Sequence, residues 1–155
     1  MTFSCYLRRK LLDHVLCRDI VVRCMAEELT KHSGHCTGFV VMPNHVHAMV
    51  FFESPDSLSP FMKLWKQRYS VQIKKVLREN LNHYESKIDL NDPVWQRKYY
   101  TFNVFSETKL REKLNYMHNN PVASGLVETP ESWKHSSARW YKLNEDVGVK
   151  IDWPA

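Results

Sequence analysis

The sequence predicts an α+β fold of the ferredoxin-like type, in which an antiparallel sheet carries two helices on one face. Three observations lead to this prediction. Apolar segments suited to strands and segments of helical periodicity follow one another in the order β-α-β-β-α-β. The two middle strands are separated only by a short turn, as in a hairpin. A further helix comes after the last strand and extends this core.

The first strand is predicted at Thr2–Tyr6, which is short and rich in β-branched and aromatic residues. A helix over Asp19–Lys31 follows, because apolar residues recur there at roughly helical spacing, and Ser33-Gly34 is expected to end it. The hairpin covers Gly38–Phe52. Its turn is placed at Pro43-Asn44, because proline has no N–H to donate within a sheet.

The second half of the core begins with an amphipathic helix over Leu58–Leu77. A polar surface loop is predicted over Asn80–Pro93, and the last strand over Val94–Phe105, which is dense in aromatic residues. Ser106, followed by an acidic residue, marks the start of the added C-terminal helix. That helix is expected to end before Pro121, since helical geometry is disfavoured in the residue preceding a proline.

Composition favours a single domain, with a catalytic core over residues 2–127 and a C-terminal extension over 128–155. A chain of 155 residues can bury a sizeable core, and 43% hydrophobic residues argue against disorder. A net charge of +5 permits nucleic acid as a partner without selecting it. Four separated cysteines and the lack of a long apolar run predict a cytoplasmic protein with free thiols and no membrane contact.

The most informative stretch is the second hairpin strand, which opens with His45-Val46-His47. Side chains alternate between the two faces of a strand, so His45 and His47 share one face while Val46 and Ala48 lie on the other. Two adjacent imidazoles can hold a metal ion or a phosphate. Zinc and manganese both suit imidazole ligands, so the residue types alone leave the metal open.

A tyrosine, an amide and a cation lie together on the added helix. The narrow apolar stripe of this helix consists of Leu110, Leu114 and Met117. At about 100° per residue, Tyr116 lies about 125° from the centre of the stripe, and Asn120 lies about 40° from Tyr116. Lys113 is on the same flank and could bind a phosphate. Tyr116 is therefore either a rim residue with a hydrogen-bonded hydroxyl or a nucleophile assisted by a metal or a base.

Longer strings place these residues in a wider pattern: VMPNHVH, VWQRKYYTFNVFSE, EKLNYMHNNPVASGLVETPESW and SSARWY. In this order they resemble the single-tyrosine HUH transposases, and most closely the branch of REP-associated tyrosine transposases. The match extends over nearly the whole chain. Departures from the family pattern are Ala48 and Met49 in place of two leucines, Thr101 in place of an acidic residue, and His135 in place of a tryptophan.

The resemblance implies a reaction and a role for each site residue. His45 and His47 would coordinate a divalent cation, Mg²⁺ or Mn²⁺, with Asn120 as the third ligand. Tyr116 would attack a phosphate of single-stranded DNA, form a 5′-phosphotyrosine link and free a 3′-hydroxyl. The substrates would be hairpins, such as REP-like elements or the ends of insertion sequences.

Basic and aromatic residues are candidates for contacts with such DNA, because cations bind phosphates and aromatic rings stack on bases. The nucleic-acid-binding candidates are Arg8, Arg9, Lys63, Lys66, Arg68, Trp95, Arg97, Lys98 and Lys113. Trp65 is a further candidate for base stacking. Either tryptophan could instead pack in the core, and the cations could instead form solvated surfaces.

Three functions are compatible with these residues. The first, which the resemblance favours, is a transposase or endonuclease that cleaves and rejoins hairpin DNA. The second is a non-catalytic protein that binds nucleic-acid hairpins on the same scaffold. The third is a metal-dependent phosphodiesterase that forms no covalent link to DNA. The protein could act as a monomer in cis or as a homodimer that exchanges tyrosine helices.

Overall fold

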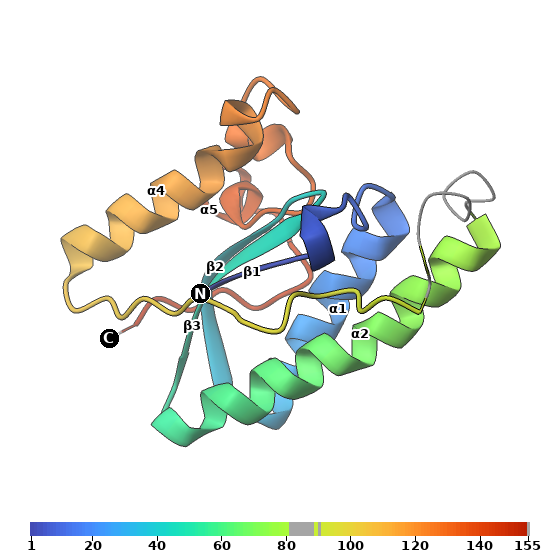
Figure 1. Cartoon of the computed structure of the whole chain (residues 1–155). Helices are drawn as coiled ribbons and strands as arrows, with labels where there is room; N and C mark the ends of the chain where they lie inside the picture. The colour runs from blue at the N-terminus through green and yellow to red at the C-terminus, as the bar shows by residue number, and fades with distance from the viewer. Residues whose placement is uncertain (81–88, 90, 155) are drawn as a thin grey trace.

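The computed structural model describes residues 1–80, 89 and 91–154, and the chain forms an α+β fold (Figure 1). The strands are β1 (Thr2–Ser4), β2 (Gly34–Val41) and β3 (His45–Phe52). The α-helices are α1 (Val15–Lys31), α2 (Leu58–Asn80), α4 (Glu107–Ala123) and α5 (Ala138–Leu143). Short 3₁₀ turns occupy Tyr6–Arg8, Pro55–Ser57 and Pro130–Ser132. The predicted fold class is confirmed, whereas most of the predicted loop at Asn80–Pro93 lies outside the described residues.

The sheet is antiparallel, with the strand order β1-β3-β2. β3 is the central strand, because Val46 pairs with Phe3 of β1 on one side and with Val41 of β2 on the other. The predicted hairpin with its turn at Pro43-Asn44 is therefore confirmed, although β2 begins earlier, at Gly34.

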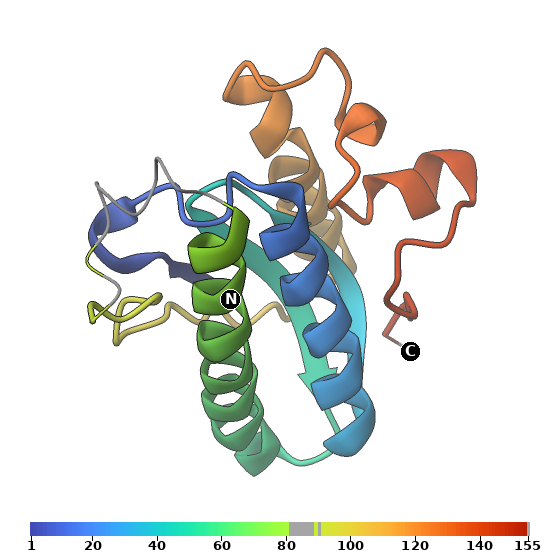
Figure 2. The same cartoon turned by 90° about the vertical axis from the view of Figure 1, so that its right-hand side faces the viewer.

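Helices α1 and α2 run side by side on one face of the sheet, and α4 lies against the opposite face (Figure 1, Figure 2). Alternation along the strands supplies apolar residues to both faces. Val46 and Ala48 of β3 pack with Trp65 of α2 in the main core. The smaller cluster under α4 consists of Val40, Met42, Leu114 and Met117. Within the described parts of the chain, no helix is long and apolar enough to span a membrane.

The prediction of a regular last strand at Val94–Phe105 is wrong. The segment lies beside β1 but pairs with it at isolated positions, Thr2 with Tyr100 and Cys5 with Trp95. Between these pairs β1 advances by three residues and the outer segment by five, so the two backbones cannot keep a continuous ladder. The ferredoxin-like order is kept in a looser form, with an irregular edge segment in place of the fourth strand.

The ends of α1 and α4 differ from the prediction in different ways. α1 ends just before Ser33 as expected, but the residue with a positive φ is Ser33, at 48°, and Gly34 is instead the first residue of β2. A Cβ at Gly34 would lie 2.3 Å from a ring carbon of Phe52, so this glycine serves strand packing rather than helix termination. α4 continues through Pro121 to Ala123. Pro121 is tolerated because it stands in the last turn, where its missing N–H removes a single hydrogen bond.

Gly38 allows α4 to approach the sheet closely. It lies in β2 opposite Met49, next to a shift in the β2–β3 register. A Cβ at this position would lie 2.3 Å from Leu114 Cδ1 and 3.1 Å from Met117 Cε. The close approach of α4 to the sheet therefore depends on the lack of a side chain at Gly38.

We expect Gly38→Ala to lower the free energy of unfolding by about 1–3 kcal/mol, because the added methyl group displaces Leu114. Urea unfolding measures this cost. In a Leu114→Ala background, where the clashing group is gone, the same substitution should cost much less. Equal costs in the two backgrounds would contradict the packing argument.

The C-terminal extension packs along the outer edge of β2. The Val41 N–H donates to the His135 carbonyl at 2.9 Å, and the Asp152 N–H donates to the Cys36 carbonyl at 2.8 Å. The imidazole of His135 is buried and lies between two residues of α1. Arg18 Nε donates to His135 Nδ1 at 3.2 Å, and His135 Nε2 donates to Asp19 at 2.8 Å. This arrangement requires a neutral ring, because Nδ1 must accept a hydrogen bond.

The His135 contacts predict a pH dependence of stability. Burial lowers the pKa of His135 below its ordinary value, and the nearby Arg18 and Lys134 charges lower it further while Asp19 opposes them. As pH falls below about 6.5, the unfolded chain takes up a proton that the folded chain does not, so the free energy of unfolding decreases. Urea unfolding at about pH 7.5 and about pH 5 should show a larger decrease for the wild type than for His135→Gln. Equal decreases would contradict this role for His135.

Candidate active site

His45 and His47 lie on the same face of β3, as strand alternation predicts. Their rings are in edge-to-face contact, with centroids 4.8 Å apart. Both side chains are half-buried, and Val46 between them is fully buried in the core. Core packing therefore fixes the pair from behind, while the imidazoles project toward the α4 side of the sheet.

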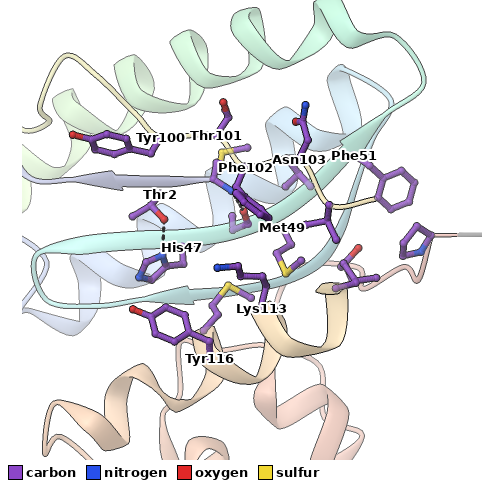
Figure 3. Close-up of a pocket in the computed structure, with 18 of the residues that line it drawn as sticks. Thr2, His47, Met49, Phe51, Tyr100, Thr101, Phe102, Asn103, Lys113 and Tyr116 are labelled. Atoms are coloured by element: carbon purple, nitrogen blue, oxygen red, sulfur yellow. Dashed lines mark hydrogen bonds between the residues drawn. The ribbon is translucent and has the colours of Figure 1, made fainter. Parts of the chain in front are cut away.

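Each imidazole is held through its Nδ1 atom. His47 Nδ1 lies 2.7 Å from the Thr2 hydroxyl on the neighbouring strand (Figure 3). His45 Nδ1 lies 2.6 Å from Oδ1 of Asn44. These contacts leave the Nε2 atom of each ring as the nitrogen that can bind a ligand.

Burial keeps both imidazoles neutral. It lowers the pKa of His47 to about 4, with smaller contributions from His45, the N-terminal amino group of Met1 and Arg8. Burial and the Arg8 charge also lower the pKa of His45. The neutral ring is the form that binds metals, so this pair is ready to act as a ligand at neutral pH.

Tyr116 reaches the pair from α4. Ser106 caps this helix by accepting a 3.3 Å hydrogen bond from the Lys109 N–H, as the sequence predicts. The predicted apolar stripe is buried, whereas Tyr116 is 65% exposed. Its ring centroid is 6.3 Å from that of His47 in the same chain (Figure 3). The structure therefore brings one tyrosine hydroxyl and two imidazoles into a single site.

A pocket of about 610 Å³ adjoins Tyr116 and His47, between α4, β3 and residues 100–105. Its walls include the apolar side chains of Met49, Phe51 and Phe102 (Figure 3). Lys113 Nζ lies 4.9 Å from the centre of the Phe102 ring. Aromatic surface beside a cation suits an unstacked base and its phosphate.

The amide of Asn120 is hydrogen-bonded within its own helix. Its Nδ2 donates a 3.2 Å hydrogen bond to the backbone carbonyl of Tyr116, one turn earlier on α4. The side chain is half-buried and is not part of the pocket lining. The role of Asn120 as a third metal ligand stays a prediction.

The two imidazoles fit the divalent cation that the sequence pattern implies. Both are neutral, and their contacts at Nδ1 are compatible with a lone pair on each Nε2, which suits Mn²⁺. Across the residues that the structure describes, no group of three His, Cys, Asp or Glu side chains could hold a metal ion. A cation held by the pair would therefore take its other ligands from phosphate, water or amide oxygens, and such oxygens also suit Mg²⁺.

The family model described as IS200-like transposase matches residues 1–120. The chain belongs to the IS200-like transposase family. The matched range contains His45, His47, Tyr116 and Asn120, and so it includes every predicted catalytic and metal-binding residue. The C-terminal extension lies beyond it.

Two individual comparisons agree with this family. A REP-associated tyrosine transposase of Haemophilus influenzae is 26% identical over 118 residues, which cover 73% of this chain and 62% of the relative. The present chain thus spans less than two thirds of that relative. A solved structure described as a REP-associated tyrosine transposase bound to a REP hairpin has a TM-score of 0.68 at 15% identity, covering 97% of this chain and 83% of that one. Its likeness shows a shared fold, and the resemblance inferred from the sequence is confirmed.

Three predicted DNA contacts lie on α2, which covers the face of the sheet opposite the histidine pair. Lys66 Nζ donates to the Gln96 carbonyl at 2.6 Å and so holds the edge segment. Arg68 forms a 2.7 Å ion pair with Glu28 of α1. Lys63 is exposed to solvent. These cations do not converge on Tyr116, and their contact with DNA stays a prediction.

Neither candidate tryptophan is available for base stacking. Trp65 is fully buried and Trp95 is 5% exposed, and the ring of Phe3 packs edge-on against both. Of the two alternatives given for Trp95, the structure favours core packing, since this residue closes the edge segment over the core. Exposed aromatic rings are found on the same segment at Tyr100, Phe102 and Phe105.

The remaining predicted cations differ in their surroundings. Arg8 is close enough to both imidazoles for its charge to lower their pKa values. Arg9 is engaged in a 2.8 Å ion pair with an aspartate, and Arg97 and Lys98 are exposed on the edge segment. Among the predicted cations, Arg8 acts on both imidazoles and Lys113 lines the pocket beside Tyr116.

The sequence does not reveal the roles of Thr2 and Asn44 in the candidate site. Thr2 is predicted only as a strand residue, and its contact with His47 spans 45 positions of the chain. Asn44 is predicted only as a turn residue. Its position immediately before His45 is the signal that could have suggested a contact with the imidazole.

Proposed function

We propose that this IS200-like transposase is a metal-dependent, single-tyrosine enzyme that cleaves and rejoins single-stranded hairpin DNA. The observation that carries the proposal is the position of Tyr116, whose ring lies 6.3 Å from His47. A solved structure of the same fold is described as bound to a REP hairpin. That likeness supports a REP-like hairpin or an insertion-sequence end as the substrate.

The chemistry is a phosphoryl transfer to Tyr116. Its hydroxyl oxygen forms a bond to the scissile phosphorus, and the bond from phosphorus to the leaving 3′-oxygen breaks. The proton lost by the tyrosine balances the proton gained by the 3′-oxygen. The products are a 5′-phosphotyrosine link and a free 3′-hydroxyl. One phosphoester replaces another, so the 3′-hydroxyl of a second strand can reverse the reaction and join new DNA.

The chain supplies three aids to this transfer. His45 and His47 would hold Mg²⁺ or Mn²⁺, which when bound polarises a phosphate oxygen as a Lewis acid. Lys113 offers a positive charge for a phosphate at the pocket that Tyr116 lines. Phe51 and Phe102 offer apolar surface for a base next to that phosphate.

The same geometry supports action by a monomer in cis, because Tyr116 and the histidine pair belong to one chain. In a homodimer that exchanges tyrosine helices, the contacts of Leu114 and Met117 with Val40 and Met42 would be re-formed between the two chains.

A labelling experiment separates the three candidate functions. The protein is incubated with Mn²⁺ and a pool of labelled single-stranded hairpins with randomised flanks, and the products are resolved on a denaturing gel. A protein-linked band together with cut DNA supports the proposal. Cut DNA without a linked band indicates a phosphodiesterase. Hairpin binding with neither product indicates a binding protein without catalytic activity.

A further inference from the structure

The side chain of Asn44 bridges two elements next to the site. Asparagine is common at turns because it tolerates a positive φ, but Asn44 does not have a positive φ. Its side chain instead connects the 3₁₀ turn to β3. Nδ2 lies 3.4 Å from the backbone carbonyl oxygen of Arg8, and Oδ1 lies 2.6 Å from His45 Nδ1.

These partners determine how the amide and the imidazole are oriented. A backbone carbonyl oxygen can only accept a hydrogen bond, so the atom of Asn44 that faces Arg8 must be its NH₂ group. The atom that faces His45 is then the amide oxygen, which can also only accept. His45 Nδ1 must therefore carry the proton, and the lone pair of this ring lies on Nε2.

His47 lacks an equivalent constraint. Its Nδ1 contacts the hydroxyl of Thr2, which can donate or accept a hydrogen bond and so permits either tautomer. The neighbours of His45 therefore determine its tautomer, whereas those of His47 do not.

The backbone around Asn44 keeps the Arg8 carbonyl in place. Leu7 and Arg8 both have a φ of 52°, a conformation that costs a residue other than glycine about 1 kcal/mol or more. The Arg8 N–H donates to the Cys5 carbonyl at 2.9 Å, and the Cys5 N–H donates to the backbone carbonyl of Asn44 at 2.9 Å. The strained turn and the hairpin turn therefore hold each other.

We propose that Asn44 is a positioning residue that fixes His45 in the Nδ1–H tautomer and so presents its Nε2 lone pair to a divalent cation. The part of this inference that concerns the cation rests on the proposed function. The part that concerns the tautomer does not, because it can be observed without metal or DNA.

The test uses metal-free protein labelled with ¹⁵N in its histidines, whose long-range ¹H–¹⁵N spectra distinguish the two tautomers. The wild type should show His45 with the proton on Nδ1. Asn44→Ala should shift His45 toward the Nε2–H form, which free imidazole side chains favour. Isothermal titration with Mn²⁺ should show binding about 10- to 100-fold weaker in this variant.

Two further variants make the test specific. Asn44→Asp keeps an oxygen that accepts from Nδ1–H, so it should retain the wild-type tautomer. Asn91→Ala removes an exposed asparagine amide elsewhere and should change neither the tautomer nor the Mn²⁺ affinity. A wild-type His45 with its proton on Nε2 would overturn the proposal, as would unchanged Mn²⁺ affinity in Asn44→Ala. Failure of the wild type to cleave DNA would instead contradict the proposed function and leave the tautomer result intact.

Discussion

Replacing Tyr116 with phenylalanine is expected to abolish both cleavage and covalent capture of hairpin DNA while leaving the DNA bound. The substitution removes the only atom of this side chain that can attack phosphorus, so the cleavage rate should fall by a factor on the order of 10⁴ or more. Tyr116 is 65% exposed and its helix is held by other residues, so the fold should be unaffected. Denaturing gels measure cleavage and capture, and fluorescence anisotropy measures binding.

Tyr6→Phe is a matched control for this variant, because it removes a tyrosine hydroxyl from the 3₁₀ turn between β1 and α1. It should cleave as the wild type does. A Tyr116→Phe protein that still formed a protein-linked product would show that another residue is the nucleophile.

Replacing His47 with alanine is expected to have the second large effect. The ring of His47 neighbours those of both Tyr116 and His45, so its loss removes one of the three predicted metal ligands and a neighbour of the nucleophile. We expect Mn²⁺ affinity to fall by at least about 100-fold and cleavage by a factor on the order of 10³. Isothermal titration measures the affinity, and timed cleavage assays measure the rate.

His14→Asn provides the control for the loss of one imidazole. His14 caps α1 by accepting a hydrogen bond from the Leu16 N–H, and asparagine is a good residue at a helix N-cap. This variant should keep its metal affinity and its cleavage rate. If His47→Ala bound Mn²⁺ as tightly as His14→Asn, the histidine pair would not be the metal site.

The parts of the site that could be predicted from the sequence are those set by local periodicity. Strand alternation places His45 and His47 on one face, and helical spacing turns Tyr116 away from its buried stripe. The contacts from Thr2 and Asn44 depend on side-chain atoms of neighbouring segments, which no periodicity encodes. The role of Asn120 as a metal ligand stays a prediction. It follows Tyr116 by one helical turn, and its amide donates a hydrogen bond to the Tyr116 carbonyl.

Three differences from the predictions each have a physical reason. The segment Val94–Phe105 has the composition of a strand, but its two extra residues relative to β1 break the ladder. Trp95 has the chemistry to stack on a base, yet the core beside Phe3 buries it. Pro121 disfavours a helix in isolation but stands where a single lost hydrogen bond is tolerated. Pairing register decided the first case and core packing the second, whereas the position of the proline within its helix decided the third.

Both edges of the sheet are covered by other segments of the chain, and this limits how far the chain can be shortened. The edge segment bonds to β1, and the C-terminal extension bonds to β2 through the backbones of His135 and Asp152. A fragment that ended with the family-matched range at residue 120 would lose the second of these covers. The uncovered β2 would then offer unpaired backbone groups to other chains, and such edges promote strand-to-strand aggregation. The shortest stretch of chain that carries all the predicted catalytic residues is therefore not the shortest one that should resist aggregation.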